Sequence, residues 1–133
     1  MTNTENTITP DGDLSTRVVA MPADTNADGD MFGGWALSQM DLAGGLVAKK
    51  IAQGRVVTIA LDSMTFLLPI FIGDTLCCYA KLIKTGKSSI TIKIEAWAGR
   101  QYEDKRVKVT EGIFTYVAIC SNRKTRKITD KYS

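Results

Sequence analysis

The amino-acid sequence contains no histidine among its 133 residues. This absence excludes serine–histidine and cysteine–histidine nucleophilic pairs, zinc sites built on imidazole ligands, and dehydration chemistry that depends on a histidine base. Any acid–base catalysis must therefore use aspartate, glutamate, lysine, tyrosine or cysteine.

Cysteine is also scarce, with Cys77, Cys78 and Cys120 as the three examples. An odd count with two adjacent cysteines does not indicate a disulfide framework. Neighbouring residues of a strand point to opposite faces, so Cys77 and Cys78 cannot bind one metal ion together. We expect all three to be small core residues.

Long apolar runs are missing, because Asp41, Lys49 and Lys50 interrupt the longest candidate for a membrane span. The polar N-terminus lacks the basic start and apolar centre of a secretory signal. We therefore expect a cytoplasmic protein with one globular domain over residues 14–121. A flexible N-terminal tail (1–13) and a basic C-terminal tail (122–133) are predicted to flank it.

The charge is divided unevenly along the chain. Residues 1–75 hold four Lys or Arg and nine Asp or Glu, whereas residues 76–133 hold thirteen and five, for a net charge of +3. A basic second half suits an anionic partner such as nucleic acid, a membrane surface or a phosphorylated small molecule.

The central feature of the sequence is the stretch from Met21 to Ala52. It passes from an Asp-rich loop to a helix predicted over residues 35–53, which is apolar nearly all round and is therefore expected to be buried. Asp41 is the one acid in this helix. An uncompensated buried charge is costly, so Asp41 is either a catalytic group or an acid held by nearby donors, with Ser38 and Gln39 as candidates.

Glycine occurs at two informative places in the same stretch. Gly33 and Gly34 lead into the helix, where free backbone N–H groups and the helix dipole can bind an anion or a developing oxyanion. The alternative is a plain entry turn. Gly44 and Gly45 indicate a close approach to the helix, or room for a substrate beside Asp41.

The loop over residues 24–30 imitates the start of a calcium-binding loop. The twelfth position, however, is Trp35 instead of a bidentate glutamate, and no helix precedes the loop. We expect no metal site here, and interpret the segment as a turn-rich loop that brings polar side chains to a pocket.

Beyond residue 55 the apolar pattern alternates with period two. It predicts four long strands joined by hairpins, after a first strand before the loop; the predicted strands cover residues 14–21, 56–68, 75–84, 89–98 and 107–120. The fold class is therefore α+β, with one long central helix wrapped by a curved antiparallel sheet of about five to six strands. This is the hot-dog architecture.

The turn over residues 86–89, Gly-Lys-Ser-Ser, can contact phosphate groups through amides, hydroxyls and positive charge, with Arg55 and Lys84 as candidate neighbours. It is not a P-loop, because the GxxxxGK[ST] pattern is absent. The alternative is solvated surface charge. The basic residues of 123–127 have no interleaved aromatic side chains, which favours a solubilising tail over a nucleic-acid site.

Three segments together resemble the hot-dog-fold acyl-CoA thioesterases, and within them the YciA-type acyl-CoA hydrolases. They are MPADTNADGDMFGGWALSQMDLAGGLVAKKIAQGRVVT, SMTFLLPIFIGDTLCCYAKLIKTGKSSITIKIEAW and TEGIFTYVAI, within residues 14–120. The resemblance implies hydrolysis of a fatty acyl-CoA to the free acid and CoA, with no cofactor beyond the CoA of substrate and product. Many relatives have histidine in place of Phe32, but the YciA-type group commonly has phenylalanine there.

The resemblance also implies roles for individual residues. Asp41 would be the general base or the nucleophile, Asn26 from a partner subunit would orient the water or thioester, and Gly33 and Gly34 would polarise its carbonyl group. The candidates for the CoA end are Arg55, Gly86, Lys87, Ser88 and Ser89. The site would form in a homodimer, within a trimer of dimers, without nucleic-acid or membrane partners.

Two other functions remain open at this point. A non-catalytic acyl-CoA sensor of the same fold would bind CoA esters without turnover. A nucleic-acid-binding protein would use the basic C-terminal segment. Neither the acyl-chain preference nor the choice between base and nucleophile follows from the residues alone.

Overall fold

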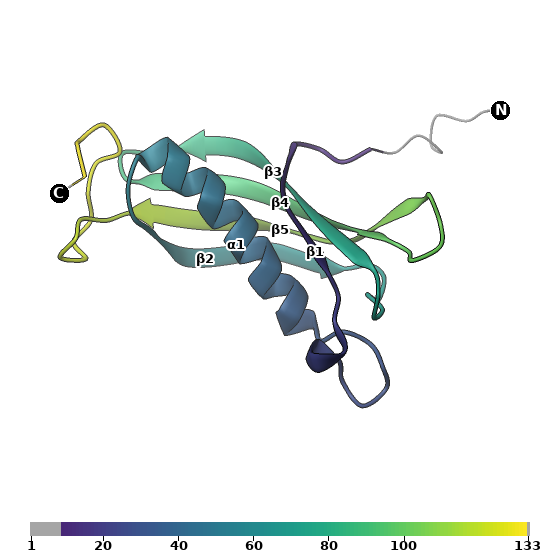
Figure 1. The fold of residues 1–133 in the computed structure, drawn as a ribbon. Helices are drawn as coiled ribbons and strands as arrows, with labels where there is room; N and C mark the ends of the chain where they lie inside the picture. The colour runs from purple at the N-terminus through teal and green to yellow at the C-terminus, as the bar shows by residue number, and fades with distance from the viewer. Residues whose placement is uncertain (1–8, 133) are drawn as a thin grey trace.

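The computed structural model describes residues 9–132 and shows one long helix lying across a curved five-stranded sheet (Figure 1). The predicted α+β hot-dog arrangement is confirmed. The helix α1 follows one 3-10 turn, η2, and the strands are numbered along the chain. Their bounds are β1 (Asp13–Val19), η2 (Pro22–Asp24), α1 (Gly33–Ala52), β2 (Val56–Phe66), β3 (Thr75–Thr85), β4 (Ser89–Gly99) and β5 (Arg106–Ala118).

The strand order is β1-β3-β4-β5-β2, and every neighbouring pair is antiparallel. The prediction that β2 and β3 form a hairpin is wrong, because β2 pairs with the last strand and lies at the far edge of the sheet. The connection between them crosses the end of the sheet. The buried carboxylate of Asp74 fixes its end by accepting a hydrogen bond from the amide of Phe71 (2.8 Å) and pairing with Arg100.

The helix begins two residues earlier than predicted. Phe32 is the extended N-cap, so Gly33 and Gly34 are the first two helical residues and not a turn before the helix. The chain leaves α1 at Gln53, whose φ of 52° places it in the left-handed region. Its amide bonds the carbonyl oxygen of Lys49, which satisfies one of the last acceptors of the helix.

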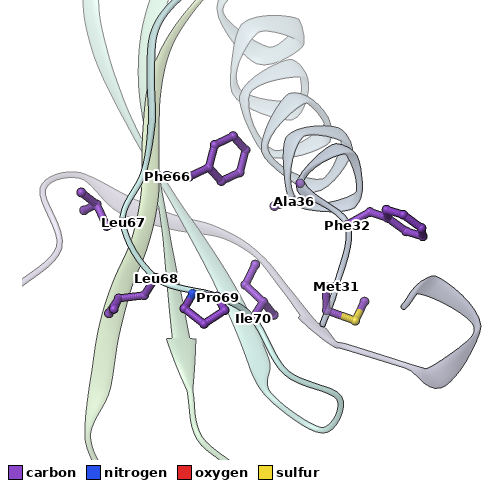
Figure 2. Close-up of a pocket in the computed structure, with 9 residues that line it drawn as sticks. Met31, Phe32, Ala36, Phe66, Leu67, Leu68, Pro69 and Ile70 are labelled. Carbon is purple, nitrogen blue, oxygen red and sulfur yellow. The ribbon is translucent and has the colours of Figure 1, made fainter. Parts of the chain in front are cut away.

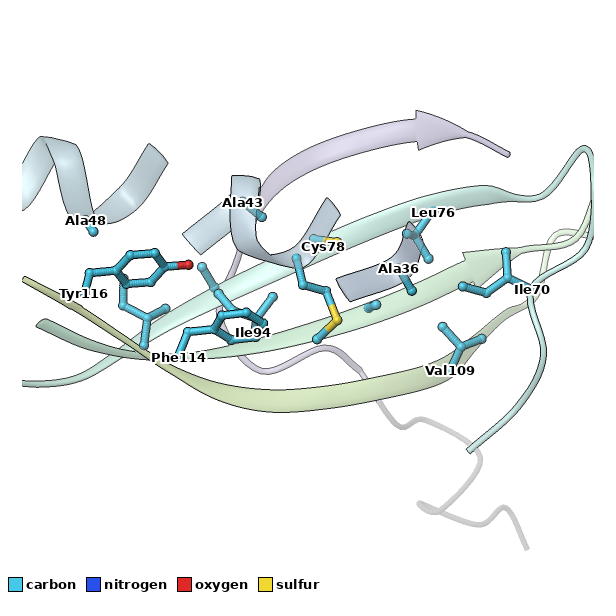
Figure 3. Packing of buried hydrophobic residues seen from close by; sticks show 14 of the residues in the cluster. Ala36, Ala43, Ala48, Ile70, Leu76, Cys78, Ile94, Val109, Phe114 and Tyr116 are labelled. Atoms are coloured by element: carbon cyan, nitrogen blue, oxygen red, sulfur yellow. The ribbon is translucent and has the colours of Figure 1, made fainter. Parts of the chain in front are cut away.

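The core lies between α1 and the concave face of the sheet (Figure 3). Small residues on the helix, including Ala36, Ala43 and Ala48, allow the sheet to approach closely. They pack against larger side chains such as Ile94, Phe114 and Tyr116. Cys77 and Cys78 are buried as predicted, whereas Cys120 is only partly buried.

The apolar composition of the helix predicts burial on all sides, but one face of the helix is exposed. The side chains of Leu42 and Leu46 are 60% and 49% exposed. The sheet of one chain covers only one face of α1, so these leucines lie on the uncovered face. Among the described residues, no helix combines the length and the apolar character needed to cross a membrane.

The opposite face of the sheet is partly covered as well. The alternation in β4 places Glu95 and Trp97 on the face away from α1, yet they are only 2% and 4% exposed. Glu95 accepts hydrogen bonds from the indole N–H of Trp97 (2.9 Å) and the amide of Asp11 (3.2 Å), and pairs with Lys93 (3.1 Å). Asp11 therefore contacts the sheet, although the sequence places it in a flexible tail. Residues 1–8 of that tail lie outside the described residues.

The basic segment at the end of the chain packs against the helix and the sheet. The Arg126 guanidinium is buried and donates to the carbonyl oxygens of Ala52 (2.9 Å) and Asp130 (2.8 Å). The amide of Ile128 bonds the carbonyl oxygen of Lys87 (2.8 Å). Arg126 thus caps the C-terminal end of α1, where a positive charge is favourable.

Candidate active site

The Asp41 side chain lies halfway along α1 and is held by two hydroxyl groups from the sheet. Thr58 Oγ1 donates to Asp41 Oδ1 at 2.7 Å, and the Tyr116 hydroxyl lies 3.1 Å from the same oxygen. Thr58 and Tyr116 are direct partners across the β2–β5 ladder, so both side chains project from the concave face. The predicted alternative partner, Ser38, instead bonds the carbonyl oxygen of Trp35 (2.8 Å).

The Tyr116 hydroxyl is a permanent donor. Burial and the nearby negative charge of Asp41 raise the pKa of Tyr116 well above its usual range, so the phenol keeps its proton. The hydroxyl also lies 3.0 Å from the main-chain carbonyl oxygen of Asp41. In the described residues, Asp41 Oδ2 receives no hydrogen bond, so one carboxylate oxygen stays open to a substrate or water.

Gly44 makes room for this arrangement. A Cβ atom at Gly44 would lie 2.2 Å from the Tyr116 hydroxyl and 2.9 Å from Ile94 Cδ1. The same atom at Gly45 would meet only a ring carbon of Tyr116, at 3.9 Å. The interpretation that Gly44 leaves space for a substrate is therefore wrong, because the tyrosine side chain fills that space.

The first turn of α1 offers unused N–H groups. Gly33 and Gly34 are too early in the helix to have intrahelical partners, and their amides donate to no group within residues 9–132. No side chain caps this end, and no acidic residue occupies its first turn. A Cβ at Gly34 would meet nothing within 4 Å, so this part of the backbone is open to a ligand.

An apolar hollow of about 380 Å³ adjoins the same helix end (Figure 2). The Phe66 side chain points toward the helix, and its ring lies 3.2 Å from the position of a Cβ at Gly33. The lining residues come from the start of α1 and from the segment after β2; they are Met31, Phe32, Gly33, Ala36, Phe66, Leu67, Leu68, Pro69 and Ile70. Such a surface fits a hydrocarbon group.

Asn26 uses one half of its side-chain amide to shape the loop. Its Oδ1 accepts from the amides of Asp28 (2.9 Å) and Asp30 (3.1 Å). Its NH₂ group donates to no residue in the described part of the chain, and Asn26 makes no hydrogen bond to Asp41 of its own chain. No group of three or more metal-binding side chains occurs among residues 9–132, which includes this loop.

The predicted CoA-binding residues lie together at the end of the molecule away from Gly33 and Gly34. The amide of Gly86 donates to the carbonyl oxygen of Ser89 (2.8 Å). At the end of β5, the amide of Ala118 donates to the carbonyl oxygen of Ser88 (2.8 Å), and the amide of Ile119 donates to that of Arg55 (3.0 Å). A second hollow of about 200 Å³ is lined in part by Lys87 and Lys127. This end adjoins the C-terminus of α1, so the length of a 20-residue helix, about 30 Å, separates it from the glycine pair.

The structure thus brings Asp41 together with two residues that the sequence analysis missed. Thr58 and Tyr116 lie 17 and 75 positions from Asp41 in the sequence. In the structure, Tyr116 shares the buried face of β5 with Gly112, Phe114 and Ala118, but the sequence alternation of residues 107–120 groups Tyr116 with Lys108 and Thr110 and gave no clear sign of this. The ladder between β2 and β5, which no local pattern reveals, brings Thr58 beside it.

Comparison with known proteins assigns the chain to a family. The sequence pattern of the thioesterase superfamily matches residues 28–105. The chain therefore belongs to the thioesterase superfamily, and its fold is that of the hot-dog thioesterases.

The relatives within this superfamily are close. The acyl-CoA thioester hydrolase YciA of Salmonella typhimurium is 50% identical over 131 residues, covering 96% of this chain and 97% of the relative. A hexameric thioesterase from Yersinia pestis has a solved structure that is 55% identical and superposes with a TM-score of 0.88, covering 92% of this chain and 99% of that one. The resemblance stated from the sequence is thereby confirmed.

A more distant relative is the acyl-CoA hydrolase of Staphylococcus aureus, solved with butyryl coenzyme A and coenzyme A. It is 29% identical with a TM-score of 0.78, covering 88% of this chain and 71% of that one. Two variants of that enzyme replace an aspartate and a threonine by alanine. The two replaced positions are 17 residues apart, which is also the separation of Asp41 and Thr58.

Proposed function

We propose that the protein hydrolyses fatty acyl-CoA thioesters to a free fatty acid and CoA, with Asp41 as the catalytic carboxylate. The observation that carries this proposal is the Asp41 carboxylate, oriented by Thr58 and Tyr116 through Oδ1 while Oδ2 stays open. The identity of 50% with an acyl-CoA thioester hydrolase supports the substrate class.

The reaction needs few groups, because a thioester is already an activated acyl compound. As a general base, Asp41 takes a proton from a water molecule while the water oxygen attacks the thioester carbonyl carbon. The tetrahedral intermediate then collapses, the carbon–sulfur bond breaks, and the CoA thiolate leaves and is protonated. As a nucleophile, Asp41 would instead form an acyl-carboxylate anhydride that water cleaves.

The glycine pair supplies the second element. The amides of Gly33 and Gly34 carry N–H groups without partners at the positive end of the α1 dipole. Gly34 has open space in front of it, which suits an oxyanion that develops on the thioester carbonyl. The neighbouring hollow would then hold part of the acyl chain. We propose that no cofactor takes part.

A single chain does not bring these groups to one point. Gly33 and Asp41 are eight residues apart on one helix, about 12 Å along its axis. We propose that a second copy completes the site. β2, which carries Thr58, is an edge strand whose Ile59 and Phe66 are 59% and 56% exposed, and Leu42 of α1 is also exposed. An apolar edge of this kind favours pairing with another strand.

Two-fold symmetry sets the relative orientation of the two subunits in this pairing. A symmetric dimer through β2 places the two α1 helices antiparallel, because each patch meets its own copy. The helix N-terminus of one subunit then lies toward the C-terminal end of the other. Asn26 and Gly34 of one subunit can in this way meet Asp41 of the partner, and the turn over residues 86–89 approaches the same site from the partner's side.

The basic residues suit the anionic end of CoA. Lys87 and Lys127 line one hollow beside the turn, and Arg55, Gly86, Ser88 and Ser89 lie at the same end of the sheet. Phosphate groups bind well to such combinations of cations, hydroxyls and amides. We propose a trimer of dimers as the full assembly, since the Yersinia pestis relative is described as hexameric. A cytoplasmic location stays a prediction.

The decisive experiment measures release of CoA from acyl-CoA with a thiol reagent. The wild-type protein should release CoA, and Asp41→Asn should lose most turnover while it keeps the fold and the affinity for CoA. Full turnover by Asp41→Asn would overturn the proposed mechanism. Binding without turnover by both proteins would favour an acyl-CoA sensor instead. A profile over acyl-chain lengths then gives the preferred substrate.

A further inference from the structure

We infer that Tyr116 is a positioning residue of this reaction, which holds the Asp41 carboxylate by Oδ1 and leaves Oδ2 as the oxygen that acts. This inference rests on the proposed function, because it assumes that Asp41 is the catalytic acid. It adds a residue and assigns different tasks to the two carboxylate oxygens.

The geometry distinguishes the two oxygens clearly. The Tyr116 hydroxyl lies 3.1 Å from Oδ1 and 3.0 Å from the main-chain carbonyl oxygen of Asp41, so it contacts both ends of the same residue. Thr58 Oγ1 reaches Oδ1 at 2.7 Å. Two donors on one oxygen, fixed by a β ladder, restrict rotation of the carboxylate. Oδ2 receives no hydrogen bond from the described residues, and the restricted rotation of the carboxylate holds it in one position.

Tyr116 is itself held rigidly. Its side chain is 1% exposed and packs against Phe114 with 6.4 Å between ring centroids (Figure 3). The missing side chain at Gly44 leaves the space that the hydroxyl occupies. Because burial and the charge of Asp41 raise the pKa of Tyr116, its proton stays available to the carboxylate throughout the assay range.

Few other ionisable groups face Asp41 from the elements packed against α1. On the concave face, β4 presents Ile90, Ile92 and Ile94, and β2 presents Thr58, which does not titrate. The thiol of Cys78 on β3 and the carboxylate of Asp13 on β1 belong to strands on the far side of β4. On the helix itself, Lys49 and Lys50 lie in the last turn. Among residues 9–132, Tyr116 is therefore the titratable side chain that bonds the Asp41 carboxylate.

Loss of the Tyr116 donor would leave Thr58 as the remaining hydroxyl on Oδ1, so the carboxylate could rotate away from the position in which Oδ2 acts. Loss of orientation should lower kcat, whereas KM should change little, because Tyr116 is covered and does not meet the substrate.

The test compares Tyr116→Phe with Tyr79→Phe. The control removes a hydroxyl on the other face of the sheet, where Tyr79 accepts from Arg106 (2.6 Å). For Tyr116→Phe we expect a fall of about tenfold in kcat at a nearly unchanged KM. For Tyr79→Phe we expect no change in either constant.

A second variant keeps the ring and the hydroxyl in place. Substitution of Tyr116 by 3-fluorotyrosine retains the hydroxyl donor, so kcat should return close to the wild-type value with KM unchanged. A wild-type kcat in Tyr116→Phe, or a loss of kcat that 3-fluorotyrosine does not restore, would overturn the inference. The proposed function would still stand if Asp41→Asn were inactive in the same assay, so the two failures are distinguishable.

Discussion

The hydroxyl of Tyr116 occupies the place where a side chain at Gly44 would begin. A Cβ built there would lie 2.2 Å from the hydroxyl oxygen, far inside van der Waals contact. Glycine in mid-helix costs up to about 1 kcal/mol relative to alanine, so its presence needs a compensating gain. The gain here is a buried tyrosine that reaches both the main chain and the carboxylate of Asp41.

This relationship predicts opposite effects at the two adjacent glycines. Gly44→Ala should reduce the free energy of unfolding by about 2 kcal/mol and reduce turnover, because the methyl group displaces Tyr116. Gly45→Ala should be neutral or stabilising by up to about 1 kcal/mol, since its Cβ meets only an atom at 3.9 Å. Urea unfolding and CoA release measure the two quantities. Equal behaviour of both variants would contradict this account of Gly44.

A second prediction concerns Glu95, on the opposite face of the sheet. Burial alone would raise the pKa of Glu95, but the bonds from Trp97, Asp11 and Lys93 outweigh it and lower the pKa below its usual value. The carboxylate is thus stabilising at neutral pH, and this contribution disappears as the pH falls through the lowered pKa.

Glu95→Gln should therefore lose about 2 kcal/mol of stability at pH 7 and show a flatter decline of stability between about pH 5 and pH 3. Chemical unfolding at a series of pH values measures both effects. Glu103→Gln, in an exposed loop, is the matched control and should reproduce the wild-type curve. An unchanged pH dependence in Glu95→Gln would show that this carboxylate does not contribute to acid sensitivity.

Much of the fold follows from the sequence because its patterns are local. Alternation fixed the ranges of β3, β4 and β5 within one or two residues, and the unusual acid in an apolar helix identified Asp41. The partner strand of β2 could not be predicted in this way. Pairing between β2 and β5 joins segments about fifty residues apart, which no hairpin turn connects, so no turn residue indicates this pairing.

The same limit explains the errors at the site. Thr58 is an ordinary strand residue until the ladder places it next to Tyr116. The burial of Glu95 and of Arg126 also depends on distant partners. Glu95 accepts a hydrogen bond from the amide of Asp11, and Arg126 donates to the carbonyl oxygen of Ala52 at the end of α1. Charged side chains are rarely buried without such partners, so neither burial follows from the residue type alone.

The proposed CoA site leads to a third prediction. Lys87→Ala should raise KM for acyl-CoA several-fold with little change in kcat, because it removes a charge that would bind phosphate and not a reacting group. Lys87→Ala with Lys127→Ala should have a larger effect, since the two side chains line one hollow. The increase should shrink at high salt. Lys105→Ala, in the loop at the other end of the sheet, is the control; an equal rise there would contradict the assignment.

The last prediction tests the two-subunit site with variants that leave the loop intact. Asn26→Asp keeps the Oδ1 atom that accepts from Asp28 and Asp30, and removes only the NH₂ donor. We expect Asn26→Asp and Asp41→Asn each to lack most activity. In a mixed dimer of the two variants, one site carries both changes and the other carries neither. Random mixing by co-expression or by refolding together should thus restore about a quarter of wild-type activity.

The control for this experiment is a mixture of the two separately folded variants without subunit exchange, which should stay inactive. Gel filtration with light scattering gives the assembly state of each sample. Restored activity requires Asn26 and Asp41 to come from different subunits, because no chain in the mixture carries both native residues. Mixed dimers without activity would place both residues of each site in one chain. In that case the open NH₂ group of Asn26 would need another ligand, and the exposed edge of β2 would have to pair without building the site.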